Sequence, residues 1–153
     1  MPESAVQDLI ETCHEFDVQV STGGFVESVL VRDNDRVEEL EREGAIDPAS
    51  AVAEAHRHLD AGAYKIMVES EGITERVREW RTDVAFEIAD EVGVENCVFE
   101  AADPQVFEWY IKNFGPNVNL FVDNSQIVEL ECMRSGLWGK KSSWGRVASW
   151  TGE

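Results

Sequence analysis

The alternation of apolar and polar positions predicts a chain of helices and short strands. Residues 3–16 carry apolar side chains at helical spacing, which indicates an amphipathic helix. Residues 18–21 alternate and lead into Thr22-Gly23-Gly24, so a strand is expected to end there at a turn. An apolar run at 25–30 and a strongly charged helix at 36–43 follow. The first third of the chain therefore predicts alternating helices and strands.

Three strand-helix units are predicted after this segment. Asp47-Pro48 indicates the start of a helix that ends at Gly62. The next strands are expected at 64–68, 97–100 and 118–122, and the helices after them at 74–91, 104–113 and 125–135. The first of these apolar runs is compact enough to suggest a strand buried on both faces. Strands that alternate with helices in this way predict parallel pairing with right-handed crossovers, and hence an α/β fold.

The charge balance limits the partners of the chain. It has 31 acidic against 13 basic residues and a formal net charge of -18. Nucleic acids and anionic membranes are excluded as partners because phosphate binding depends on neutralisation by Lys and Arg. A halophilic cytoplasm is one interpretation, since salt screens the repulsion between the acids. The other is an ordinary acidic cytosolic protein.

Cysteine usage and hydropathy point to a reducing compartment. The three cysteines form no CxxC pair and are too scattered for a disulfide framework. Residues 1–11 lack the positive and apolar regions of a signal peptide, and no apolar stretch approaches 18 residues. We therefore expect a cytoplasmic protein.

Acidic side chains follow three of the predicted strands. Ligands of parallel α/β folds bind beyond the carboxyl ends of the strands, where Glu69, Glu100 and Asp123 lie. Converging carboxylates suit a hard divalent cation such as Mg²⁺, with substrate phosphate and water in its other positions. The alternative is that such acids cap the following helices, a role that also fits Asp103.

Two further sets of polar residues were considered as binding groups. Asn124 and Ser125 open a predicted helix and offer backbone N–H groups to a phosphate, although most helices begin in this way. The three histidines do not form a metal site, because His56 and His58 are two residues apart on a helix and point in different directions. A solvated role is expected for them.

Two segments near the end of the chain have a distinctive sequence: residues 114–120 read FGPNVNL and residues 129–139 read ELECMRSGLWG. Both are similar to the last strand and helix of the phosphosulfolactate synthase family, a family of α/β barrels. Residues 58–69 and 98–101 resemble the two preceding units, and residues 18–27 resemble the family's third strand. Within the family, the chain looks closer to the plant heat-stress-associated branch than to the methanogen enzymes.

The resemblance implies a magnesium-dependent lyase that adds sulfite to phosphoenolpyruvate on the way to coenzyme M. It implies catalytic roles for Glu69 and Glu100, and magnesium ligation by these two residues and Asp123. The residues expected to bind substrate or phosphate are Gly23, Gly24, Asn119, Asn124, Ser125 and Arg76.

The chain also departs from the family pattern. No segment of the sequence resembles the family's first, second, fourth or fifth strand. The lysines that would face the anionic substrates belong to these strands. We therefore expect a partial or rearranged barrel of about four parallel strands in a single domain, residues 1–153. Residues 1–36 would correspond to the family's third unit and 37–139 to its last three, followed by a Trp- and Ser-rich tail at 140–153.

The sequence is compatible with two functions. The first is a phosphosulfolactate synthase-like lyase, and the second is a non-catalytic or truncated member that acts as a stress or interaction protein. Exposed sheet edges suggest a homo-oligomer in either case.

Overall fold

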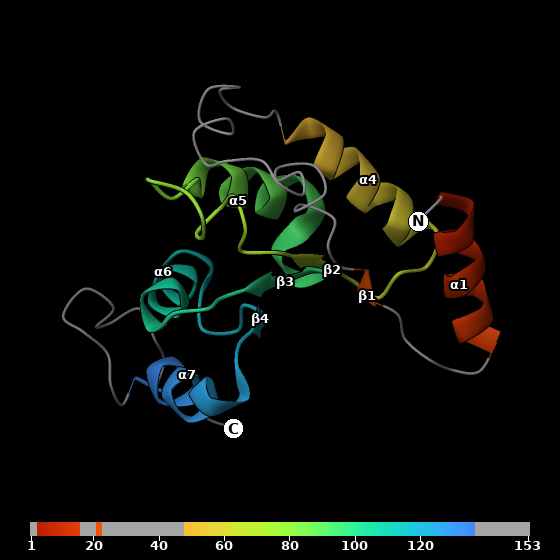
Figure 1. Ribbon diagram of the computed structural model, residues 1–153. Coiled ribbons are helices and arrows are strands. Elements are labelled where there is room, and N and C mark those ends of the chain that lie inside the picture. Colours follow the sequence, from red (N-terminus) through yellow and green to blue (C-terminus); the bar gives the residue numbers. More distant parts are fainter. Residues whose placement is uncertain (1–2, 16–20, 23–47, 137–153) are drawn as a thin grey trace. The chain divides into compact units, whose positions relative to one another are not determined.

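The computed structural model describes residues 3–15, 21–22 and 48–136 (Figure 1). The strand end at Gly23 and Gly24, the run at 25–30, the helix at 36–43 and the tail at 140–153 lie outside the described residues. The chain divides into two compact units, Met1–Val98 and Phe99–Glu153, which are described in turn. The expectation of a single domain stays a prediction.

The first unit contains the elements from α1 to the beginning of β3. They are α1 (Glu3–Glu15), β1 (Ser21–Thr22), α4 (Ala49–Asp60), β2 (Lys65–Val68), α5 (Thr82–Ile88), the π-helical η1 (Ala89–Gly93) and the 3-10 turn η2 (Val94–Asn96). The short strands β1 and β2 pair in parallel, with Ser21 opposite Lys65. In Figure 1, α4 and α5 lie above β2.

Helix α4 begins where the Asp-Pro sequence predicts, with Pro48 at the N-cap position. Its Ala51 and Ala55 are buried, because small apolar residues four apart share one face of a helix. His58 is also buried, at 7% exposure, so the expectation that it is solvated was wrong. It lies three residues after Ala55 and therefore on the same apolar face.

Strand β2 is buried on one face only. Ile66 and Val68 are fully shielded from solvent, whereas Lys65 and Met67 are half-buried. Lys65 Nζ donates a hydrogen bond to the backbone carbonyl of Glu95 and lies 4.8 Å from the centre of the Tyr64 ring. The expectation of burial on both faces is thus corrected, because the alternate position 65 carries a charge that must reach polar partners.

The helix expected at 74–91 begins later than its apolar periodicity suggests. Residues 73–81 form a loop, and α5 starts at Thr82. The carbonyl of Ser70 accepts hydrogen bonds from the N–H groups of residues 73, 74 and 75, which closes a tight turn. Arg76 then adopts a φ of 54°, which a right-handed helix does not allow, so no helix continues from this turn. The apolar face is as expected from Val84 to Ile88, and the segment ends at Gly93, whose φ is 91°.

The second unit continues β3 (Cys97–Glu100), which spans the residues predicted. Next come α6 (Pro104–Phe114), β4 (Leu120–Phe121), the 3-10 turn η3 (Asn124–Gln126) and α7 (Ile127–Arg134). Strands β3 and β4 pair in parallel, with Phe99 opposite Leu120 and Glu100 opposite Phe121. Strand β4 is shorter than the expected 118–122.

Aromatic packing forms the core of the second unit. The ring of Phe99, on β3, stacks on Tyr110 of α6 at 4.8 Å and on Phe114 at 5.5 Å between centroids. Trp109 meets Tyr110 edge-on at 5.1 Å. Phe99, Tyr110 and the neighbouring Phe107 are almost completely buried. This packing fixes α6 on β3 and so fixes the strand end at Glu100.

The observed strand pairs are parallel and connected through helices, which confirms the α/β class. The strands within the described residues form an open sheet and do not close into a barrel. None of the helices in the described part of the chain is long and apolar enough to cross a membrane.

Candidate functional site

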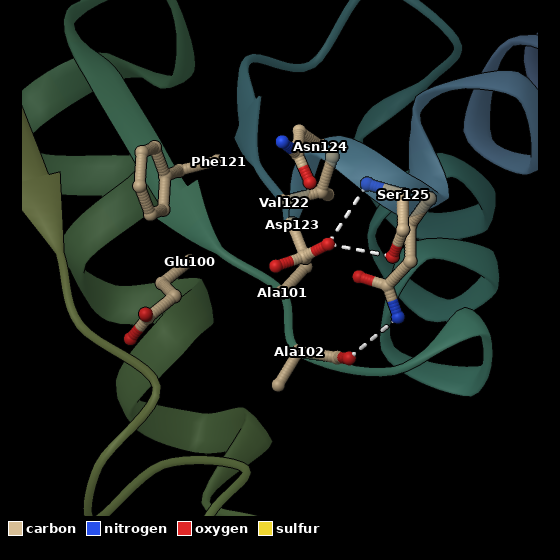
Figure 2. A pocket seen from close by; sticks show the side chains of 9 residues that line it. Glu100, Ala101, Ala102, Phe121, Val122, Asp123, Asn124 and Ser125 are labelled. Carbon is tan, nitrogen blue, oxygen red and sulfur yellow. Dashed lines mark hydrogen bonds between the residues drawn. The ribbon is translucent and has the colours of Figure 1, made fainter.

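A pocket of about 580 Å³ lies beyond the carboxyl ends of β3 and β4 in the second unit (Figure 2). Two stretches line it: Glu100 with Ala101 and Ala102 after β3, and residues 121–126 at the end of β4 and in η3. Four predicted site residues from two strand ends therefore line one pocket: Glu100, Asp123, Asn124 and Ser125. The position agrees with the general rule for parallel α/β folds.

The side chain of Asp123 is held by two hydrogen bonds from Ser125, two residues later in the chain. Its Oδ1 accepts hydrogen bonds from the hydroxyl of Ser125 at 2.6 Å and from the backbone N–H of Ser125 at 2.8 Å. These two bonds, the hydroxyl first, hold the pKa of the Asp123 carboxyl below its ordinary value. Asp123 is thus a charged, exposed carboxylate whose orientation is fixed through Oδ1.

Two side chains tie the pocket walls to the rest of the unit. Gln126 donates a hydrogen bond from Nε2 to the carbonyl of Ala102 at 2.9 Å, which links η3 to the loop after β3. Arg134 donates from Nη2 to the carbonyl of Val118 at 2.7 Å, which links the end of α7 to the segment before β4. Both strand-end loops are therefore held in a defined arrangement.

The two carboxylates of the pocket do not point toward one another. Figure 2 shows the carboxylate of Glu100 directed away from that of Asp123, on the side where the ring of Phe121 lies. Phe121 is 54% exposed. In this arrangement the carboxylates of Glu100 and Asp123 do not converge on one point.

The backbone groups predicted as a phosphate seat are already partly engaged. The N–H of Ser125 donates to Asp123 Oδ1, and the N–H of Gln126 donates to the Asp123 carbonyl at 2.9 Å. Asp123 is thus the N-cap of η3, as the capping alternative proposes, and it also lines the pocket. Asp103 occupies the N-cap position of α6 without a side-chain capping bond.

The remaining predicted site residues lie elsewhere. Glu69 follows β2 and Arg76 lies in the loop before α5, both in the first unit, whereas Arg76 was expected at the start of a helix. Asn119 precedes β4, so it stands at the opposite end of that strand from the pocket, and it is not among the lining residues. Gly23 and Gly24 lie outside the described residues.

Sequence reasoning gave no role to Glu71, which forms an ion pair with Arg76. The five-residue spacing across Gly72 contained the signal, because a Gly between an acid and a base can let the chain fold back on itself.

The described residues contain no group of three or more His, Cys, Asp or Glu side chains arranged to hold a metal ion. Magnesium ligation by Glu69, Glu100 and Asp123 stays a prediction. Burial raises the pKa of the Cys97 thiol to about 12, so this cysteine is a packing residue and not a nucleophile.

Comparison with known proteins gives two matches. The sequence profile of the (2R)-phospho-3-sulfolactate synthase (ComA) family matches residues 33–140, more than half of the chain. Protein HEAT-STRESS-ASSOCIATED 32 of Arabidopsis thaliana is 42% identical over 89 residues, which are 58% of this chain and 31% of the plant protein. The chain therefore spans about a third of this relative. On the family match, the chain belongs to the (2R)-phospho-3-sulfolactate synthase family.

Proposed function

We propose that the protein is a magnesium-dependent lyase that adds sulfite to phosphoenolpyruvate to give phosphosulfolactate. Family membership supports this proposal, and so does the pocket at the carboxyl ends of β3 and β4. The pocket carries the proposal because a fixed, charged carboxylate, that of Asp123, lines it at the place where α/β enzymes bind ligands.

The reaction sets defined chemical demands. The sulfur lone pair of sulfite forms a bond to the methylene carbon of phosphoenolpyruvate, the carbon-carbon double bond breaks, and the adjacent carbon takes up a proton. Negative charge develops on the substrate carboxylate during the attack, so the site must stabilise it. Glu100, which lines the pocket, is the proposed proton donor. A catalytic role for Glu69, at the end of β2 in the first unit, stays a separate prediction.

The residues of the pocket fit a magnesium ion in the way that phosphate-handling enzymes hold one. Mg²⁺ is usually bound through one or two carboxylates, with substrate phosphate and water in the other positions, so three protein ligands are not required. Asp123 Oδ1 is taken by Ser125, and Oδ2 is the oxygen that would bind the ion. The ion would supply positive charge to the substrate phosphate and carboxylate.

Kinetics of paired variants test this proposal. The full chain should consume phosphoenolpyruvate only with both sulfite and Mg²⁺ present, and Asp123→Asn should lower kcat/KM by about a hundredfold or more. Asp103→Asn is the matched control, because Asp103 is also an exposed acid after a strand but does not line the pocket. Equal kcat/KM values for Asp123→Asn and Asp103→Asn would show that Asp123 has no special role in the reaction.

A second proposal is a non-catalytic role in stress or in protein interaction. The similarity to a heat-stress-associated protein favours it, since that relative is named for heat stress and not for a reaction. The test compares the folded chain with an active full-length relative under the same conditions. If the chain fails to turn over phosphoenolpyruvate, the result would support the non-catalytic role and contradict the lyase function.

The proposed state of the protein in solution follows from its charge and its short sheet. We propose that the protein is a partial barrel that forms homo-oligomers, because an oligomer would cover exposed sheet edges. We also propose a salt-rich cytoplasm, because the acidic side chains behind the net charge of -18 repel one another unless salt screens them. Light scattering should give an oligomeric mass at high salt. A monomeric mass with intact circular dichroism would refute the assembly.

A further inference from the structure

The loop between β2 and α5 contains an ion pair between a mostly buried acid, Glu71, and a mostly exposed base, Arg76. Arg76 Nε lies 2.5 Å from Glu71 Oε1. The Glu71 side chain is only 16% exposed, whereas that of Arg76 is 71% exposed. The acid is thus fixed in the loop and the guanidinium extends from it into solvent.

The backbone that carries Glu71 is tightly bonded. Ser70, itself 1% exposed, accepts three N–H groups through its carbonyl, and Gly72 donates its N–H to the carbonyl of Glu75 at 2.9 Å. The completely buried Ile73 anchors the loop and accepts the N–H of Arg81 at 2.8 Å. A buried, cross-bonded loop of this kind gives a carboxylate a fixed position.

Arg76 adopts a backbone conformation that disfavours a side chain. Its φ is 54°, and every other described residue with a positive φ is a glycine. This conformation is unfavourable for an L-residue, whereas glycine adopts it freely. Because the Arg76 side chain is mostly exposed, packing does not offset this cost. The guanidinium itself is therefore the feature that accounts for an arginine at this position.

The ion pair leaves the binding face of the guanidinium open. Glu71 engages Nε, and the two terminal nitrogens make no hydrogen bond or ion pair with the described part of the chain. A guanidinium presents its donors as a rigid fork that matches phosphate and carboxylate oxygens in a bidentate way. The ion pair places one edge of the guanidinium beside a carboxylate and so limits the directions in which the fork can point.

We propose that Glu71 is a positioning residue that aims Arg76 at the phosphate or carboxylate of a small anionic ligand. This inference rests on the proposed function for the identity of that ligand, phosphoenolpyruvate. It adds a cationic group, supplied by the loop after β2, to a chain whose overall charge is strongly negative.

Calorimetric titration with phosphoenolpyruvate and with inorganic phosphate, at fixed ionic strength and without sulfite, tests the proposal. Glu71→Gln should weaken binding of phosphoenolpyruvate about tenfold, because the charge-assisted contact that orients Arg76 is lost. Arg76→Lys should weaken it by a similar factor, since a lysine lacks Nε and the planar fork. In turnover, both variants should raise KM with little change in kcat.

Two controls separate positioning from a structural role. Arg76→Gly should melt at the same or a higher temperature than the parent while losing affinity, because glycine accepts a positive φ. Asp83→Asn removes a second Arg-carboxylate pair, in which Arg81 Nη2 lies 2.8 Å from Asp83 Oδ2, and should leave ligand affinity unchanged.

The outcomes distinguish the two proposals. If the parent chain binds phosphoenolpyruvate through Arg76 but never turns it over, the lyase function fails and the positioning role stands. If turnover occurs and Glu71→Gln changes neither KM nor affinity, the positioning role is wrong and the lyase function stands. A parent chain with no affinity for either anion, or variants whose affinity falls only as far as their stability, would also overturn the role of Glu71.

Discussion

The loops after β2 and β4 begin at equivalent places, where a parallel strand ends, yet they are stabilised in different ways. The loop after β2 has a buried apolar anchor, Ile73, and exposes a cation held by an acid. The loop after β4 lies between two exposed apolar residues, Phe121 at the end of β4 and Ile127 at the start of α7, and holds an acid through a hydroxyl and an N–H group. One location in an α/β fold can therefore offer either sign of charge, depending on a few local contacts.

The largest expected effect concerns the anchor of the first loop. Ile73→Ala should lower the free energy of unfolding by about 2–5 kcal/mol, because Ile73 is completely buried and its truncation leaves a cavity. Ile127→Ala, at 55% exposure after the second loop, should change it by less than about 0.5 kcal/mol. Urea denaturation measures both, and similar losses would erase the contrast between the loops.

The next effect is a gain in stability within the first loop. Thr74 Oγ1 is shielded from solvent and makes no hydrogen bond within the described residues. Thr74→Val keeps the shape of the side chain and removes the unpaired hydroxyl, so the free energy of unfolding should rise by about 1 kcal/mol. Thr12→Val is the control, since the exposed Thr12 hydroxyl is bonded to the Asp8 carbonyl at 2.7 Å and should give no gain. A loss at Thr74 would show that its hydroxyl has a partner.

The smallest effect concerns the acid of the second loop. Ser125→Ala should raise the pKa of Asp123 toward its ordinary value without reaching it, because the backbone N–H of residue 125 still donates to Oδ1. A carbon-13 NMR titration of the aspartate carboxyls measures the change. Ser135→Ala, which removes a hydroxyl bonded to the backbone carbonyl of Glu131, should leave this titration unchanged.

The same pKa sets the direction of a pH effect on stability. The folded-state pKa of Asp123 lies below its unfolded value, so its contribution is present above the unfolded pKa and is lost as the pH falls through the folded pKa. Ser125→Ala should therefore reduce stability near neutral pH relative to the parent, and the difference should disappear in acid. A difference that grows in acid would contradict this assignment.

The sequence predicted those parts of the fold whose signals are local. Strand β3 and helix α6 follow from a short apolar run and from Asp103-Pro104, and both are observed where expected. The helix start at 74 was wrong because Arg76 adopts a φ of 54°, a backbone conformation that interrupts a right-handed helix and that apolar periodicity does not reveal. The burial of His58 likewise depends on packing around α4, which spacing alone does not report.

The candidate site was predictable in location but not in geometry. Strand-end placement put Glu100 and Asp123 at one edge of the sheet, because parallel strands share a carboxyl edge, and both residues line one pocket there. Their roles in catalysis and metal binding stay predictions. Strand-end placement did not show that Glu100 points away from Asp123, nor that Ser125 engages Oδ1. Glu71 was missed because its partner Arg76 was assigned to a helix, where the two side chains would not have met in this way.

Phosphorus-31 NMR of the reaction mixture with Mg²⁺ tests directly whether this chain joins sulfite to phosphoenolpyruvate. The phosphoenolpyruvate signal should be replaced by one new phosphate-ester signal, with one sulfite consumed for each phosphoenolpyruvate. An unchanged phosphoenolpyruvate signal in the presence of folded protein, sulfite and Mg²⁺ would contradict the lyase function, and so would release of inorganic phosphate in place of a new ester.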